Sequence, residues 1–176
     1  MNLFKKRPHL INNYIADVVY GANDGIITTF AIVSGVQGGH LSKAILIILG
    51  FVNLLADGLS MGASSYLSHR VGAAAKGISS GCLDPVYHGA VTFISFSVFG
   101  AVPLISFLIP GFAEHQFWIS CVSSAISLFF VGSLRVFVLG RGWLQGGLEM
   151  LAVGGIAAIT AYAVGHYLAQ HFHFSF

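Results

Sequence analysis

Long apolar stretches alternate with short polar segments along the whole chain. A helix needs about 20 mostly apolar residues to cross a bilayer. Five stretches reach that length, and they predict spans near 14–37, 44–67, 88–110, 116–139 and 146–169. The prolines fit this division, since Pro85 precedes the third span, Pro110 suits its end, and Pro103 should kink it near its last turn. The pattern predicts an all-α, polytopic membrane protein with a single transmembrane domain over residues 1–176 and no soluble domain.

The composition supports a membrane protein. Of the 176 residues, 56% are hydrophobic and 8% are charged, whereas soluble domains carry about 25% charged residues. The net charge of +2 is small and the basic residues are scattered, which argues against a nucleic-acid partner. Cys82 and Cys121 match no zinc-binding spacing and are expected to be small packing residues. The expected surroundings are therefore a lipid bilayer.

Basic residues predict the orientation of the chain. Six of them flank the cytoplasmic side of the predicted spans, and Lys43 is the one on the other side; the six are Lys5, Lys6, Arg7, Arg70, Lys76 and Arg141. The positive-inside rule then places the N-terminus in the cytoplasm and the C-terminus outside. Small size and the lack of a transit-like or cleavable leader favour a prokaryotic plasma membrane over a vacuolar one.

Two aspartates interrupt the first apolar span. Asp24 lies near its middle, and Asp17 lies seven residues earlier on the same helical face. Gly21 and Gly25 form a GxxxG pair around this position, which permits close helix packing. An odd number of spans excludes a two-fold repeat of the whole chain, so a pathway with symmetric halves needs two copies. We therefore expect a homodimer with the first helices at the two-fold axis.

The second span carries its own polar stripe. Asn53, Asp57 and Met61 are spaced i, i+4, i+8, so an amide, a carboxylate and a thioether share one face. With both helices centred on the bilayer, Asp24 and Asp57 fall at similar depth, where two carboxylates either share a proton or bind a cation. The alternative is that these residues are polar contacts that hold the bundle together, but a buried carboxylate is a costly way to do so. A pair between Arg135 and Glu149 is interpreted as structural.

The ligand types narrow the ion. A mixed oxygen and thioether site suits Fe²⁺ or Mn²⁺, whereas zinc would recruit histidine or cysteine. The histidines fall at span ends or in loops and are interpreted as interfacial polar residues; they are His9, His40, His69, His88, His115, His166, His171 and His173. An alternative role for His166, His171 and His173 is to bind metal after its release outside the cell.

Three segments together resemble the vacuolar iron transporter family. They are YGANDGIITTFAIVSGVQGG, GFVNLLADGLSMGASSYLS and RGWLQGGLEMLAVGGIAAITAYAVG, and the likeness extends from about Asp17 to Leu168. The resemblance implies a five-helix dimer that exchanges Fe²⁺, often Mn²⁺, for protons and moves metal out of the cytosol. It also implies an ion path at the dimer interface between the first and second helices, with the family's aspartate at Asp24 and its methionine at Met61.

The chain departs from the family pattern in three places. A family glutamate is replaced by Asn53 and a glycine by Asp57, so a carboxylate has moved one turn along the face. The usual Gly-Glu-Tyr after the methionine reads Ser64-Ser65-Tyr66, and the cytosolic metal-binding domain between the second and third spans is absent. The linker Ser68–Tyr87 is too short for such a domain, so the chain looks like the short branch of the family.

These observations predict a proton-coupled Fe²⁺ or Mn²⁺ exporter whose partners are a second copy, the metal ion and protons, with no resident cofactor. The expected metal ligands are Asp24, Met61, Asp57 and Asn53. Asp24 and Asp57 are also expected to carry the protons, and Asp17 and Glu149 are secondary candidates. The other hypothesis is a small membrane binding or assembly subunit without transport activity. An enzyme is not expected, because the chain has no HExxH, no GxSxG and no cluster of nucleophile and base.

Overall fold

The computed structural model describes residues 9–75, 77, 84–112, 114–134 and 142–171, and their regular structure is helical throughout. The elements are α1 (His9–Gly38), α2 (Lys43–Ala75), α3 (Asp84–Gly100), α4 (Val102–Leu108), the 3-10 turn η1 (Pro110–Phe112), α5 (Gln116–Leu134) and α7 (Trp143–His171). The prediction of an all-α chain is confirmed for these residues.

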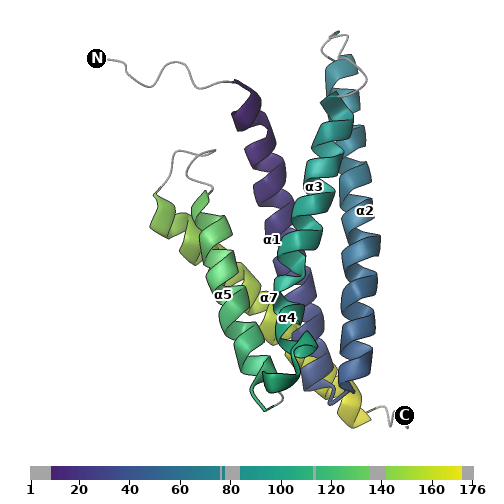
Figure 1. Ribbon diagram of the computed structural model, residues 1–176, viewed down its shortest axis with the longest axis vertical. Helices are drawn as coiled ribbons and strands as arrows, with labels where there is room; N and C mark the ends of the chain where they lie inside the picture. Colours follow the sequence, from purple (N-terminus) through teal and green to yellow (C-terminus); the bar gives the residue numbers. More distant parts are fainter. Residues whose placement is uncertain (1–8, 76, 78–83, 113, 135–141, 172–176) are drawn as a thin grey trace.

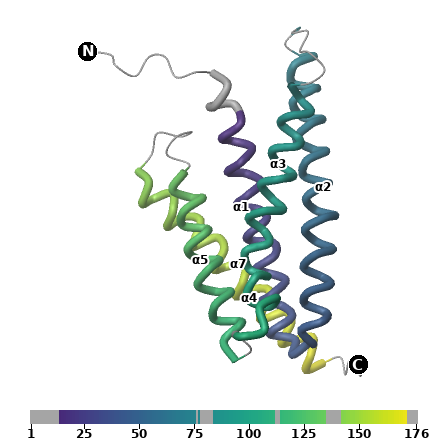
Figure 2. The backbone as a smooth tube through the Cα atoms, viewed as in Figure 1, coloured from purple at the N-terminus to yellow at the C-terminus, as the bar shows by residue number. Residues whose placement is uncertain are grey.

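Helix α1 lies in the middle of the molecule. Figures 1 and 2 show α2 and α3 on one side of it and α5 on the other, while α7 crosses it, and the start of α1 and the end of α7 lie at opposite ends of the bundle. α1 contacts α2, α3, α4, α5 and α7. Two apolar clusters are built on it: one holds Val33, Leu46 and Phe96, and the other holds Ile26 and Leu128. The central place of α1 shields most of its surface from surrounding lipid.

Three of the described helices, α2, α5 and α7, are long and apolar enough to cross a membrane. A fourth span results if α3 and α4 count as one, although they are bent by 41°. Their outward side chains are large and apolar, as at Trp118 (68% exposed) and Ile159 (72% exposed), which suits contact with lipid tails. The chain is an integral membrane protein. The five-span count and the orientation stay predictions, since α1, with Asn23 and Asp24 in its middle, is not among the spans that meet this test.

The predicted kink in the third span is confirmed, but its position differs. The break lies at Ala101, between α3 and α4, and Pro103 stands in the first turn of α4. Proline lacks an N–H and is tolerated in a first turn, so it begins a new helix instead of bending the old one. The Pro103 carbonyl accepts a hydrogen bond of 2.8 Å from the Ser120 hydroxyl, which ties α4 to α5.

The glycine pair of α1 packs within the chain. A Cβ at Gly21 would lie 2.5 Å from the Thr92 carbonyl oxygen, and one at Gly25 would overlap the backbone of Phe96. The predicted close helix approach is therefore confirmed, with α3 as the partner. The expectation that these glycines join two copies of α1 is wrong, because their surface is already covered by the same chain.

Helix α2 continues well beyond the predicted end of its span. It runs to Ala75, and α3 begins at Asp84, so most of the expected linker Ser68–Tyr87 is helical. The polar residues Ser68, His69 and Arg70 mark the edge of the apolar stretch without ending the helix, because a helix can continue from hydrocarbon into water. The predicted end of the fourth span at 139 falls within residues 135–141, outside the described part of the chain.

Candidate functional site

The two mid-span carboxylates lie on neighbouring helices. Asp24 on α1 is half-buried, whereas the side chain of Asp57 on α2 is exposed on the single chain. The charges of the two groups are close enough to act on one another. The structure thus brings together the two residues predicted to carry protons and metal, and one of them faces away from the bundle.

Asn53 connects α2 to the same part of α1. Its side-chain N–H donates to the Thr28 hydroxyl at 3.4 Å, and that hydroxyl donates to the Asp24 backbone carbonyl at 2.9 Å. The amide of Asn53 therefore lies beside Thr28, one helical turn after Asp24 on α1. The side-chain oxygen of Asn53 takes no part in the bond to Thr28. Asn23 adds a side-chain oxygen that is buried with no hydrogen-bond partner in the described structure. Polar oxygens gather around this level of α1.

Met61 occupies a different environment. It is half-buried and packs against the apolar cluster that includes Phe96 and Leu54. Its neighbours in this cluster are apolar. Its role as a metal ligand stays a prediction.

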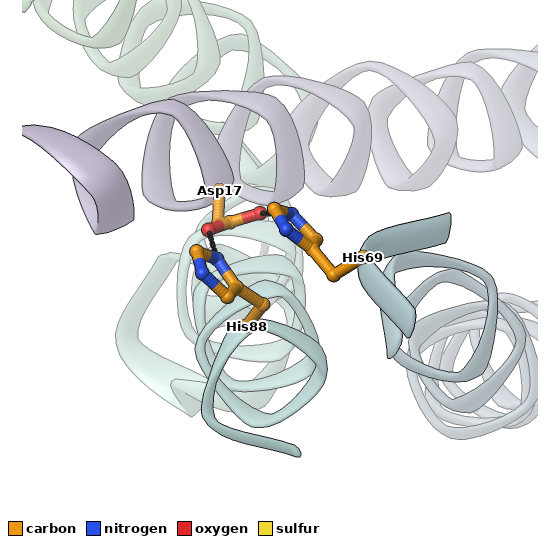
Figure 3. A group of neighbouring side chains, drawn as sticks. All are labelled: Asp17, His69 and His88. Atoms are coloured by element: carbon orange, nitrogen blue, oxygen red, sulfur yellow. Dashed lines mark hydrogen bonds and ion pairs between the residues drawn. The ribbon is translucent and has the colours of Figure 1, made fainter. Parts of the chain in front are cut away.

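A second group of ligand-type side chains lies toward the N-terminal end of α1. Asp17, His69 and His88 come from α1, α2 and α3, and Figure 3 shows both imidazole rings beside the Asp17 carboxylate. Each residue offers one ligand atom, and these atoms all lie within 4.8 Å of one another. Asp17, a secondary candidate in the sequence, is the centre of the group.

The contacts within this group are close. His88 Nδ1 bonds to Asp17 Oδ2, and His69 Nε2 lies 3.6 Å from Asp17 Oδ1. The two imidazole rings are stacked, with centroids 3.6 Å apart and planes 8° from parallel. Ser65 donates to Asp17 Oδ1 at 3.4 Å. Asp17 and His88 are buried, whereas the His69 side chain is 42% exposed.

More polar groups surround the outer edge of the group. Asp84, at the start of α3, lies 4.0 Å from His88 Nε2 and accepts a 3.2 Å hydrogen bond from the Tyr14 hydroxyl. The Tyr14 ring stands 4.7 Å from that of His88. Arg70 is the nearby cation along α2, and it donates to the Tyr66 hydroxyl at 3.2 Å.

The interpretation of every histidine as an interfacial polar residue is wrong for His88, which is buried and paired. A weak sequence signal pointed to His69, since Met61, Ser65 and His69 repeat on α2 the i, i+4, i+8 spacing of Asn53, Asp57 and Met61. No comparable signal links His88 to this series, because its proximity arises from the packing of α3 on α1 and α2.

The other candidates lie on or beyond α7. His166 Nε2 bonds to the Gln170 amide at 2.9 Å, and His171 Nδ1 bonds to the Tyr167 carbonyl at 2.9 Å, so their rings are engaged locally. His173 lies outside the described residues. Glu149 lies on α7 with an exposed side chain, and its predicted partner Arg135 also lies outside the described residues.

The helix bundle and its apolar outer surface define an integral membrane protein, and α1, α2 and α3 carry side chains of the types that bind metal ions. The model of the VIT family matches residues 15–76 and 73–166, and the chain belongs to this family.

Known relatives extend the likeness over most of the chain. A vacuolar iron transporter of Toxoplasma gondii is 26% identical over 226 aligned positions, covering 89% of this chain and 75% of that protein. Vacuolar iron transporter homolog 2 of Oryza sativa subsp. japonica is 21% identical and covers 91% of this chain and 93% of its own length. A vacuolar iron transporter of Plasmodium berghei is 45% identical over 69 positions, which are 38% of this chain and 25% of that protein.

Proposed function

We propose that this protein transports a divalent metal ion, Fe²⁺ or Mn²⁺, out of the cytosol in exchange for protons. The observation that carries the proposal is the pair Asp24 and Asp57, two carboxylates on adjacent helices within mutual electrostatic range. Membership of a family whose named relatives are vacuolar iron transporters supports the metal as cargo. Carboxylate and amide oxygens with a thioether nearby suit these two ions better than Cu⁺ or Zn²⁺.

We place the ion path between two copies of the chain, along α1 and α2. The exposed side chain of Asp57 supports this placement, because an aspartate at the centre of a bilayer-spanning helix costs at least about 2.5 kcal/mol when it faces lipid. A second copy that covers this face would remove the carboxylate from lipid and supply its own Asp24 and Asp57. The GxxxG pair takes no part in this contact, since α3 covers it.

Proton exchange follows from the same two carboxylates. Groups of like charge at close range hold a proton between them when no cation is present, and a divalent ion that binds there displaces it. Alternating loading with metal and with protons would couple the two flows in opposite directions.

Flux measurements in liposomes test this proposal. Purified protein should move Fe²⁺ and Mn²⁺ faster than Zn²⁺, and metal leaving one compartment should acidify that compartment as protons enter it. Metal flux that neither responds to a pH gradient nor moves protons would contradict the coupling. No flux of any metal by a correctly inserted protein would favour the binding or assembly subunit instead.

A further inference from the structure

We propose that Asp17, His69 and His88 form a binding site for a divalent transition-metal ion, Fe²⁺ foremost, at one end of the bundle. Its role as the place where cargo first binds rests on the proposed function, whereas its ligand chemistry does not. This end holds the start of α1, the end of α2 and the start of α3 (Figure 1), and the distribution of basic residues predicts that it is cytoplasmic.

The ligand atoms are close enough for one ion, and the adjustment that binding requires is a rotation of the His69 ring out of its stack on His88, because parallel rings cannot both point a lone pair at one ion. In a four-coordinate site with metal–nitrogen distances near 2.0–2.1 Å, ligand atoms lie about 3.3 Å apart. Here the three ligand atoms lie within 4.8 Å of one another, and His69 Nε2 is already 3.6 Å from Asp17 Oδ1. Asp17 and His88 are held in place by burial, while the His69 side chain is 42% exposed and has solvent on one side into which its ring can turn.

The set of donors indicates the class of metal. Two imidazoles and one carboxylate with positions left open are typical of Fe²⁺ sites, and imidazole also suits Zn²⁺, Co²⁺ and Ni²⁺. Hard ions such as Mg²⁺ and Ca²⁺ prefer sites made of oxygen alone. Three protein ligands leave a coordination position open for water on the exposed side. Sites that exchange what they bind have such an open position, whereas structural sites use four protein ligands.

The site is in line with the mid-span carboxylates. Asp17 precedes Asp24 by seven residues on α1, which is about 10 Å along the helix axis. His69 follows Met61 by eight residues on α2, or about 12 Å. The same two helices therefore carry ligands at both levels, so an ion released from Asp17 has its next carboxylate on the same helix. Asp84, whose side chain is 62% exposed beside His88, adds negative charge at the solvent-facing edge of the site.

A purely structural role is the competing explanation. The bond between His88 and Asp17 would join α3 to α1 with or without a metal. His69 distinguishes the two explanations, because its ring is 42% exposed and takes no part in the bond between His88 and Asp17 but would supply one of three metal ligands.

Metal binding to the purified protein in detergent tests the site apart from transport. Co²⁺ serves as the probe, because its visible absorption reports on its ligands and it does not oxidise as Fe²⁺ does. The background is Asp24→Asn with Asp57→Asn, which removes the mid-span carboxylates. In this background we expect one Co²⁺ per chain, displaced by Fe²⁺ and Zn²⁺ but not by Mg²⁺. His69→Gln should weaken binding by at least about tenfold, as losing even an outer partner of a ligand does.

The matched control is His115→Gln, an exposed histidine in the turn before α5; the start of α5 lies at the opposite end of the bundle from the start of α1 (Figure 1). It should leave Co²⁺ binding unchanged. Equal affinity in the background protein, His69→Gln and His88→Gln would overturn the site, and His69→Gln decides alone if the buried His88 variant fails to fold. Binding that depends on these histidines in a protein without flux would retain the site and reject transport. If the wild type transports metal but Co²⁺ binding does not depend on either histidine, transport is retained and the site is rejected.

Discussion

At the scale of single residues, Asp24 is the side chain on which the proposed transport depends most. Asp24→Asn keeps the size and hydrogen-bonding capacity of the side chain and removes its charge. Insertion should be normal and stability equal or higher, because a costly half-buried carboxylate has been lost. Metal flux should fall by at least about tenfold, the scale on which disturbed metal sites lose function.

The flux of Asp24→Asn is best compared with that of Glu114→Gln in liposomes at matched protein content. Glu114 lies in the exposed turn before α5, so its substitution removes one charge outside both groups of ligand-type residues and should leave flux unchanged. If Asp24 only held helices together, Asn would keep that contact, and wild-type flux in Asp24→Asn would reject its role in ion binding.

Met61 allows a separate test of metal preference. Met61→Leu conserves volume and apolarity, so its half-buried contacts with the core should survive with a stability loss below about 1.5 kcal/mol. Without the sulfur, flux of Fe²⁺ should fall relative to that of Mn²⁺, which depends less on soft ligands. Met150→Leu is the control, since Met150 also packs against an apolar cluster but lies on α7. An unchanged ratio of the two fluxes in Met61→Leu would remove the methionine from the ligand set.

At the scale of helices, the contact of α1 with α3 depends on the absence of a side chain at Gly25. A methyl group there would overlap the backbone of Phe96, which cannot move as a flexible side chain can. Gly25→Ala should therefore destabilise the protein by about 1–3 kcal/mol, as overpacking does, and lower its melting temperature in detergent.

Gly72→Ala on α2 provides the opposite case. A Cβ at Gly72 meets no atom within 4 Å, and alanine is favoured over glycine inside a helix by about 0.5–1 kcal/mol. Its melting temperature should stay the same or rise. A Gly25→Ala protein as stable as Gly72→Ala would show that the α1–α3 distance is not set by this glycine.

The apolar pattern predicted the helices well because lipid demands long apolar stretches. It predicted their ends less well where a helix leaves the bilayer, as α2 does between residue 67 and Ala75. Helical spacing alone grouped Asn53, Asp57 and Met61, since they share a helix. The pairing of His88 with Asp17 joins residues 71 positions apart, and only the packing of α3 on α1 creates it. Sequence reasoning placed Asp24 and Asp57 at one depth on adjacent helices and missed the pairing of His88 with Asp17.

At the scale of the whole molecule, the exposed carboxylate of Asp57 indicates which face a second copy would cover. Tyr20 lies one turn before Asp24 on α1 and is 63% exposed, and Ser60 lies three residues after Asp57 on α2 with an exposed side chain. Both should therefore lie at the boundary between two copies. Ala22 and Ile26, on the buried side of α1, are 1% and 0% exposed and should not reach a partner.

Cysteine crosslinking in membranes tests this arrangement. In a background with Cys82→Ser and Cys121→Ala, Tyr20→Cys or Ser60→Cys should give a disulfide-linked dimer upon mild oxidation, because a Cα separation below about 7 Å permits the bond. Ala22→Cys should remain monomeric on a denaturing gel. Ile159→Cys controls for random collisions, since it lies 72% exposed on the outer face of α7. Efficient crosslinking at Ile159 with none at Tyr20 or Ser60 would move the interface to α7, leave Asp57 facing lipid, and remove the physical basis for an ion path shared by two copies.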